Sequence, residues 1–464
     1  MQRTDIGRLR QKWDEGPLFW LFLLLILMSP FYLGLVSPWA WGMWSVLIGG
    51  SLVVQSLQFL KDGSLKIKDL KAIGLPVGMF IAVLLWCVFQ ILPGVPESWV
   101  HPIWQAAFGM HNIEPKLRIS VNPEKTMQDT LRLLAYGAVF FAAYCWARDR
   151  KKARQIINAL VGAGLAYSVY GLLIQFSDAQ MILWFEKTAY VKDLTSTFVN
   201  RNTYATYAGM VLICSSALLF ETFSRGLETT LPLKERIRSL LIGLDGRGWF
   251  LLVSWVVVLT ALLSSHSRAG FVSTLVGMVV LLFAVKQTHT HQKSSGVILL
   301  VGLSVGVGVL FLISGEILGS RLLFTSLNSD SRPIVYSLTF NAALERPIWG
   351  TGLGTFPDVF RAIRTEDLPK FFLQAHNTYL ELFLELGAVG ALLMMGVFAS
   401  LGTIFVRGVV NRRRDVIFPA IGISATFLVG AHSLVDFSMQ IPAIPMTYSL
   451  IAGTACAQSF SSRS

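Results

Sequence analysis

The sequence is short of charge: only 14% of its 464 residues are Asp, Glu, Lys or Arg, whereas 53% are hydrophobic. A soluble domain carries about 25% charged residues, so this shortage excludes an ordinary soluble globular protein. One transmembrane helix needs roughly 20 apolar residues, which leaves room for about a dozen of them in this chain. We therefore predict an all-α polytopic membrane protein.

Cysteine is also scarce, and the four cysteines all lie inside apolar segments: Cys87, Cys145, Cys214 and Cys456. Such cysteines behave as small buried apolar side chains, and their number and placement argue against a disulfide framework. The first apolar run, residues 18–36, is long, has no A-x-A end and leads straight into a second run. No cleavable signal peptide is therefore predicted.

Metal-binding patterns are missing as well, since the sequence contains no D-x-D, E-x-D, D-x-E or H-E-x-x-H motif. The "HTH" stretch at residues 289–291 is interpreted as a solvated polar turn. We predict no metal and no cofactor. Negative charge that develops on a leaving group would then be neutralised by arginine rather than by Mg²⁺.

Apolar periodicity predicts twelve membrane spans, joined by loops that alternate in charge. Basic residues gather in the N-terminal segment and in the even-numbered loops, for example "KDGSLKIKDLK", "RDRKKAR" and "RGVVNRRRD". Because positive loops stay in the cytoplasm, both termini are predicted to be cytoplasmic. The spans cover residues 18–36, 39–60, 72–92, 128–146, 155–176, 203–223, 249–265, 270–285, 297–314, 378–405, 416–435 and 440–458.

The net charge of +12 is thus explained by membrane orientation, and no nucleic-acid partner is predicted. We predict one integral membrane domain over residues 1–464, with spans one to nine in 18–314 and spans ten to twelve in 378–458. The segment 315–377 between them is predicted to be a large periplasmic loop that carries short helices. A loop this long is more often functional than idle.

Four arginines lie at the predicted outer ends of spans or in the large outer loop: Arg201, Arg268, Arg321 and Arg332. A single arginine there can simply snorkel to the lipid headgroups. Several at one membrane level, in Asn- and Ser-rich surroundings, point instead to a phosphate group, which guanidinium binds with two parallel hydrogen bonds.

His376 stands where the large loop enters span ten and is the candidate general base, because its unperturbed pKa near ~6.5 suits proton transfer at neutral pH. The alternative is a histidine that only caps the helix. Glu381 and Glu385 are predicted to pair with an arginine, and the glycine-rich "GTGLGTF" stretch, residues 350–356, to form a tight turn. Spacing also places two further polar residues on one helical face, where they either support the site or bond locally: His432 and Asp436.

Four segments, "FVNRNTYATYAG", "SSHSRAGF", "RPIVYSLTFNAALERPIWGTGLGTF" and "AHNTYLELFLELGAVG", follow one another on the predicted outer side. Together they resemble the O-antigen ligase and Wzy-type polymerase superfamily of bacterial glycan assembly. In the last segment, His376, Asn377, Gly387 and Gly390 match the family pattern. A ligase often has Thr or Tyr after the final glycine, whereas this chain has Ala391.

This resemblance implies a GT-C-like bundle and a metal-independent, inverting glycosyltransferase in the bacterial inner membrane with a periplasmic active site. His376 would be the base, and Arg201, Arg268 and Arg332, with Arg321 as a weaker candidate, would bind the diphosphate. Asn200, Asn202, Asn377, Glu381, His432 and Asp436 would support them.

The implied donor is a glycan on undecaprenyl diphosphate, and the acceptor is a glycan or lipid A-core hydroxyl, with membrane lipids and other glycan-assembly proteins as neighbours. A ligase, a polymerase and an enzyme that glycosylates protein hydroxyls stay open. A transporter without chemistry also fits twelve spans. However, transporters usually carry polar groups near the bilayer centre, whereas here the titratable groups gather at one interface.

Overall fold

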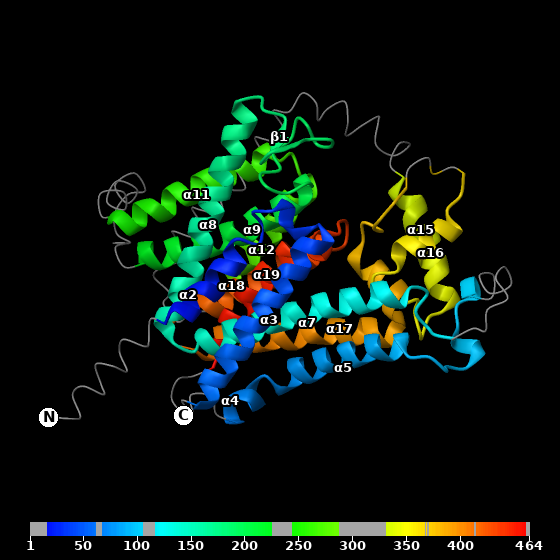
Figure 1. Ribbon diagram of the computed structural model, residues 1–464. Coiled ribbons are helices and arrows are strands. Elements are labelled where there is room, and N and C mark those ends of the chain that lie inside the picture. The colour runs from blue at the N-terminus through cyan, green and yellow to red at the C-terminus, as the bar shows by residue number, and fades with distance from the viewer. Residues whose placement is uncertain are drawn as a thin grey trace.

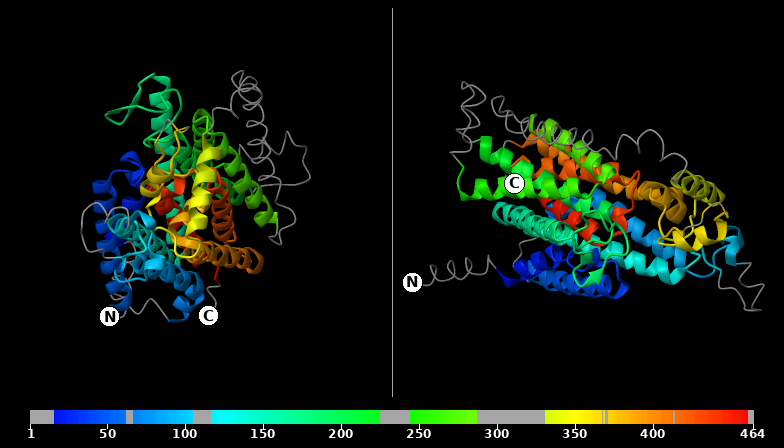
Figure 2. Two further views of the ribbon diagram at one scale, coloured as in Figure 1. Left: turned by 90° about the vertical axis from the view of Figure 1, so that its right-hand side faces the viewer. Right: turned by 90° about the horizontal axis from the view of Figure 1, so that it is seen from above.

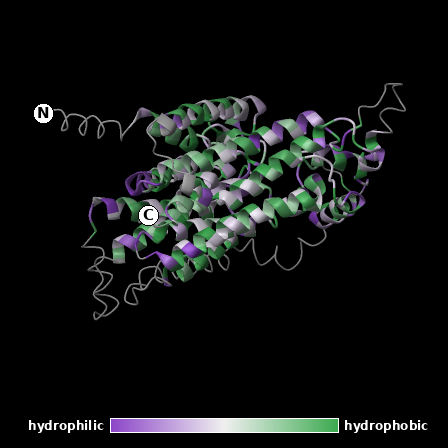
Figure 3. Cartoon of the chain, turned by 90° about the horizontal axis from the view of Figure 1, so that it is seen from below, coloured by the Kyte–Doolittle hydropathy of each residue, from purple (hydrophilic) through white to green (hydrophobic). Residues whose placement is uncertain are grey.

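The chain folds into a helical bundle, described here from a computed structural model that covers residues 16–61, 67–104, 117–224, 244–286, 331–366, 368, 371–412 and 414–460. The predicted ninth span and Arg321 lie outside these residues. Within them, seven helices are long and apolar enough to cross a membrane, and three shorter apolar helices, α2, α18 and α19, accompany them. The predicted all-α polytopic membrane fold is confirmed. Figure 3 shows apolar residues along the length of the helices and polar ones mostly near their ends.

The elements follow one another along the chain as α2 (Pro17–Leu27), η1 (Leu33–Leu35), α3 (Pro38–Lys61), α4 (Ile67–Ala72), α5 (Gly74–Ile91), η2 (Glu97–Trp99), α7 (Pro123–Trp146), α8 (Arg150–Phe176), β1 (Met181–Ile182), β2 (Phe185–Glu186), α9 (Arg201–Ser224), α11 (Gly246–Ser264), α12 (Arg268–Lys286), α15 (Arg332–Glu345), α16 (Phe356–Ile363), α17 (Thr378–Asn411), α18 (Ile417–His432), η3 (Ser438–Gln440) and α19 (Ala443–Ala457). The two short strands pair antiparallel, Met181 opposite Glu186.

Polar caps fix where several helices begin. Asn122, Asp149, Asp245 and Asn377 each accept a hydrogen bond from a backbone N–H in the first turn of α7, α8, α11 and α17. These side chains satisfy donors that a helix start leaves without an internal partner. The observed helices α7 and α8 begin five residues before the predicted spans, α11 begins three residues before, and α17 begins at the predicted residue.

Helix α9 forms the centre of the bundle. Its most apolar stretch is entirely buried, and it packs against α8, α11, α12 and α18 (Figure 1). A helix that is apolar all round lies inside a protein rather than against lipid. Its first residues, Arg201 and Asn202, are thereby held in the middle of one end of the bundle.

The first predicted span is wrong in its extent. Helix α2 ends at Leu27, and a short turn with positive φ at Leu33, Gly34 and Leu35 replaces the rest of residues 18–36. Gly34 approaches Phe198 and Ile441 so closely that a side chain there would overlap Phe198. Tertiary packing against these residues, rather than local apolarity, ends the helix.

Two short helices, α15 and α16, lie in the described part of the predicted large loop, as expected. They sit at the end of three neighbouring helices, α5, α7 and α17, at the right of Figure 1, and α15 packs on α17. Figure 2 shows the same elongated arrangement from above. Val335, Phe356 and Phe360 form a small apolar core between these helices and the start of α17.

The glycine-rich turn, residues 350–356, joins the lobe formed by α15 and α16 to the bundle. Gly350, Gly352 and Gly354 all have positive φ, which confirms the predicted tight turn. The backbone N–H groups of Thr351 and Gly352 donate to the carbonyl of Glu385, at 3.1 and 2.8 Å. That carbonyl is available because α17 is broken at Gly387, where φ is 64° and ψ is −179°.

We expect Gly387→Ala to destabilise the protein by about 1–3 kcal/mol from backbone strain alone. The added Cβ would also overlap the carbonyl oxygen of Ile348. Thermal unfolding of the purified protein in detergent should therefore show a lower midpoint. Gly402→Ala, in the regular part of α17 with its nearest atom at 3.7 Å, is the matched control and should not lower it. Equal midpoints for the two variants would contradict this account of the break.

Candidate functional site

His376 precedes α17 in a strained conformation, with φ of 56°. Such a φ is uncommon for a residue other than glycine and persists only where the surroundings enforce it. The hydroxyl of Tyr336 on α15 donates to the carbonyl of His376 at 2.9 Å, and Asn377 caps α17 through the N–H of Leu380 at 3.1 Å. Asn377, and not His376, is thus the capping residue.

The imidazole of His376 is half-buried between two aromatic rings. Both rings pack edge to face against the imidazole. The ring centroid of Phe437 lies 4.8 Å from that of the imidazole, and the centroid of Phe372 lies 6.2 Å from it. Phe437 directly follows Asp436, so the ring lies beside the polar residues at the end of α18. The geometry holds one titratable ring in a defined orientation.

The two glutamates of α17 are buried, and within the described residues neither forms the predicted ion pair with an arginine. Glu381 accepts the N–H of Ala375 at 2.8 Å, and Glu385 accepts the N–H of Phe356 at 2.9 Å. Two backbone N–H groups of the large loop, those of Ala375 and Phe356, thus take the place of the expected guanidinium group. Glu381 thereby fixes the residue next to His376, and Glu385 fixes the start of α16.

Asn202 connects three elements at one end of the bundle. Its amide donates to Asp436 at 2.9 Å, its carbonyl accepts from Ser267 at 2.8 Å, and its own N–H donates to Asn200 at 2.7 Å. Asp436 also accepts from the N–H of Ser438 at 2.9 Å. These bonds tie the start of α9 to the α11–α12 turn and to the segment after α18.

His432 and Asp436 do not share a helical face, which corrects the interpretation of their spacing. Helix α18 ends at His432, and Asp436 lies in the following turn. The Nδ1 atom of His432 bonds to Thr206 at 2.6 Å, while its Nε2 atom is buried without a hydrogen-bond partner among the described residues. Both side chains bond to α9, and Asp436 also makes the predicted local hydrogen bond, to the N–H of Ser438.

The three described arginines begin three helices, Arg201 in α9, Arg268 in α12 and Arg332 in α15. The charges of Arg201, Arg332, Asp193 and Asp436 all act on Tyr190, so each of the four lies within electrostatic reach of that side chain. Arg332 acts on His432 as well. Arg268 is exposed beside Ser267 in the same turn.

Sequence reasoning missed Asp193 and His266. Arg201 donates to Asp193 at 2.7 Å and stacks over Tyr190 at 5.4 Å, while His266 bonds to the other oxygen of Asp193 at 2.9 Å. Burial raises the pKa of Asp193, but the hydrogen bond from His266 and the charge of Arg201 outweigh it, and the pKa lies below its usual range. His266 lies inside the "SSHSRAGF" segment, two residues from Arg268. Its place in this segment was the sequence feature that could have identified it as a candidate.

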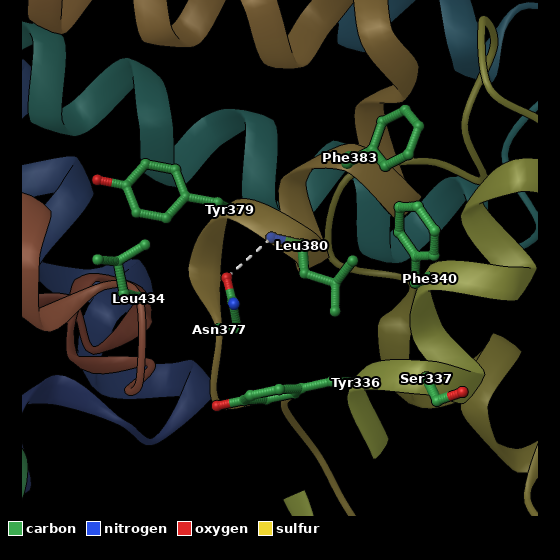
Figure 4. A pocket seen from close by; sticks show the side chains of 8 residues that line it. All are labelled: Tyr336, Ser337, Phe340, Asn377, Tyr379, Leu380, Phe383 and Leu434. Atoms are coloured by element: carbon green, nitrogen blue, oxygen red, sulfur yellow. Dashed lines mark hydrogen bonds between the residues drawn. The ribbon is translucent and has the colours of Figure 1, made fainter. Parts of the chain in front are cut away.

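An apolar groove of about 530 Å³ opens beside His376. Tyr336, Ser337 and Phe340 of α15 form one wall, and Asn377, Tyr379, Leu380, Phe383 and Leu434 form the other (Figure 4). The ring of Tyr336 therefore lines the groove while its hydroxyl holds the His376 backbone. The arrangement thus brings an apolar groove next to the segment that carries His376, and Arg332 lies one helical turn before Tyr336 on α15.

Residues 253–395 match the O-antigen ligase family, a segment that contains most of α11, all of α12, α15 and α16, and the first half of α17. A protein of Rickettsia conorii, provisionally named a polysaccharide ligase, is 21% identical over 341 residues, which cover 70% of this chain and 80% of that protein.

We expect Glu381→Ala to loosen the segment before α17, because the buried N–H of Ala375 loses its acceptor, at a cost of about 1–3 kcal/mol. Hydrogen exchange should speed up in peptides that cover residues 371–377. Glu366→Ala, at an exposed position of the same lobe, is the control and should leave those peptides unchanged. Unaltered protection in the Glu381 variant would mean that this carboxylate does not hold the segment.

Proposed function

We propose that this chain, which belongs to the O-antigen ligase family, transfers a glycan from undecaprenyl diphosphate to an acceptor hydroxyl. The observation that carries the proposal is the overlap between the matched segment, residues 253–395, and the residues assembled at one end of the bundle. Arg268, Arg332 and His376 all lie inside that segment. The coarser conclusion, a membrane enzyme of glycan transfer, rests on family membership.

His376 acts as the general base in this proposal. It takes the proton from the acceptor hydroxyl, whose oxygen attacks C1 of the sugar while the diphosphate departs from the opposite side with inversion. Its strained backbone and its edge-to-face contact with Phe437 support this role, since a base works only when it is held in reach of its proton.

Arg201, Arg268 and Arg332 bind the diphosphate and stabilise the charge that builds on it as the C1–O bond breaks. Arg201 and Arg332 share one electrostatic neighbourhood around Tyr190, which supports a common ligand with more than one negative charge. Arg321 would join them from outside the described residues. No metal takes part in the proposed reaction.

The groove beside Asn377 suits the apolar prenyl chain of the donor, because it is lined mainly by Phe340, Leu380, Phe383 and Leu434 and lies next to His376. With the site in the periplasm and both termini in the cytoplasm, as the loop charges predict, the donor would reach this groove from the outer leaflet of the inner membrane.

A Wzy-type polymerase is the second candidate, since Ala391 stands where a ligase often has Thr or Tyr. Both enzymes share the donor and differ in the acceptor. A ligase uses the lipid A core, whereas a polymerase uses a second lipid-linked repeat.

His376→Ala should abolish glycan transfer by the purified protein in proteoliposomes that contain a lipid-linked donor and its acceptor. The loss should exceed about 100-fold, the usual contribution of a general base. His101→Gln, on the outer segment before α7, is the control and should keep wild-type activity. Wild-type turnover in the His376 variant, with equal membrane insertion, would remove the base assignment.

Deletion of the gene separates the two candidates. A ligase should leave long glycans on the lipid carrier and none on the lipid A core, because only the final transfer is lost. A polymerase should leave single repeats on the core. Gel electrophoresis of surface and carrier-linked glycans measures both outcomes, and normal surface glycans would contradict either function.

A further inference from the structure

A second histidine, His266, lies near the start of α9, and a carboxylate holds its ring in one orientation. His266 lies in the turn between α11 and α12 with φ of 51°, so both histidines of the site, His266 and His376, are held in the left-handed region. Its Nδ1 atom lies 2.9 Å from Oδ1 of Asp193, and its side chain is half exposed.

Contacts from two other elements hold this turn. The N–H of Leu194 donates to the carbonyl of Ser264 at 3.1 Å, and the hydroxyl of Ser267 donates to Asn202 at 2.8 Å. The segment before α9 and the start of α9 thus fix the backbone on both sides of His266. An observed outlier held in this way is a reason to look for function.

The partner determines which ring nitrogen carries the proton. An ionised carboxylate only accepts hydrogen bonds, so Nδ1 of His266 donates to Asp193, and Nε2 points away from that carboxylate. A carboxylate that orients an imidazole in this manner sets both its tautomer and its direction.

Charged groups from every neighbouring element face this pair. Arg201 of α9 shares the carboxylate of Asp193 at 2.7 Å, and the ammonium of Lys187 donates to the Asp193 carbonyl at 2.8 Å. Tyr190 and Lys192 belong to the same segment as Asp193, and Arg268 follows two residues after His266. The imidazole is therefore linked through Asp193 to Arg201, and Arg268 lies two residues further along the chain.

We propose that His266, oriented by Asp193, is a further catalytic residue that donates a proton to the departing diphosphate. This inference rests on the proposed function. The C1–O bond breaks, its electron pair goes to the diphosphate oxygen, and the proton on Nε2 of His266 goes to that diphosphate. His376 takes the proton of the acceptor hydroxyl. His376 then releases its proton to water, and His266 takes a proton from water, so both rings return to their starting states.

The pH profile tests the role. Turnover of the wild-type protein should fall at low pH, where His376 is protonated, and at high pH, where His266 loses its proton. His266→Gln should lower kcat by about 100-fold and remove the fall at high pH. Asp193→Asn should move that fall to lower pH, because the ring loses its negative partner. His266→Lys, which stays protonated to higher pH, should retain more activity than His266→Gln and move the fall to higher pH.

The assay measures undecaprenyl diphosphate released from a lipid-linked glycan donor in proteoliposomes, with thermal midpoints recorded for every variant. His101→Gln is the matched control: burial and the charge of Arg346 lower the pKa of His101 to about 4, so its loss should leave the high-pH limb unchanged. If His266→Gln keeps the wild-type profile while His376→Ala is inactive, the role of His266 is overturned and the proposed function stands. If His376→Ala is fully active, the proposed base fails instead. Should His266→Gln unfold, the profiles of His266→Lys and Asp193→Asn decide, and unshifted high-pH limbs in both would overturn the proposal.

Discussion

The glycine-rich turn, residues 350–356, packs on the break in α17 and thereby holds α15 and α16 in place. At Gly387 the backbone of α17 leaves the helical conformation, and the carbonyl of Glu385 becomes free to accept N–H groups from Thr351 and Gly352. Gln90 of α5 donates to the same carbonyl at 2.9 Å, and Trp86 donates to the carbonyl of Leu386 at 2.8 Å. A membrane helix cannot leave carbonyls without partners inside the protein, so the turn and the break depend on each other.

The contact between the glycine turn and the break in α17 determines where His376 lies. The turn holds α15 and α16 against the start of α17, and Tyr336 of α15 reaches the carbonyl of His376. From the other side, Asn202 and Asp436 connect α9 to the segment that carries Phe437, which contacts the imidazole. The ring thus lies where a lobe from the large loop meets the central helix of the bundle, and its surroundings come from four distant parts of the chain.

Part of the positive charge in the site already has a carboxylate partner. Asp193 pairs with both Arg201 and His266. In the proposed function, the diphosphate competes with this carboxylate for the guanidinium group, since it carries more negative charge than the carboxylate does. A cluster of positive groups can in this way persist at a membrane interface, where unpaired charge is costly.

The sequence by itself determined the membrane class, most of the helices, the tight glycine turn and the candidate residues His376, Arg201, Arg268 and Arg332, because apolar runs, loop charge and short motifs are local properties. Only the tertiary structure decided the end of α2 at Leu27, the backbone partners of Glu381 and Glu385, and the Asp193–His266 pair. Those features depend on contacts between residues far apart in the chain: Gly34 packs on Phe198, and Asp193 meets His266 across 73 positions. Spacing along one helix also misled for His432 and Asp436, since α18 ends at His432 and both side chains bond to α9, a contact that the spacing could not predict.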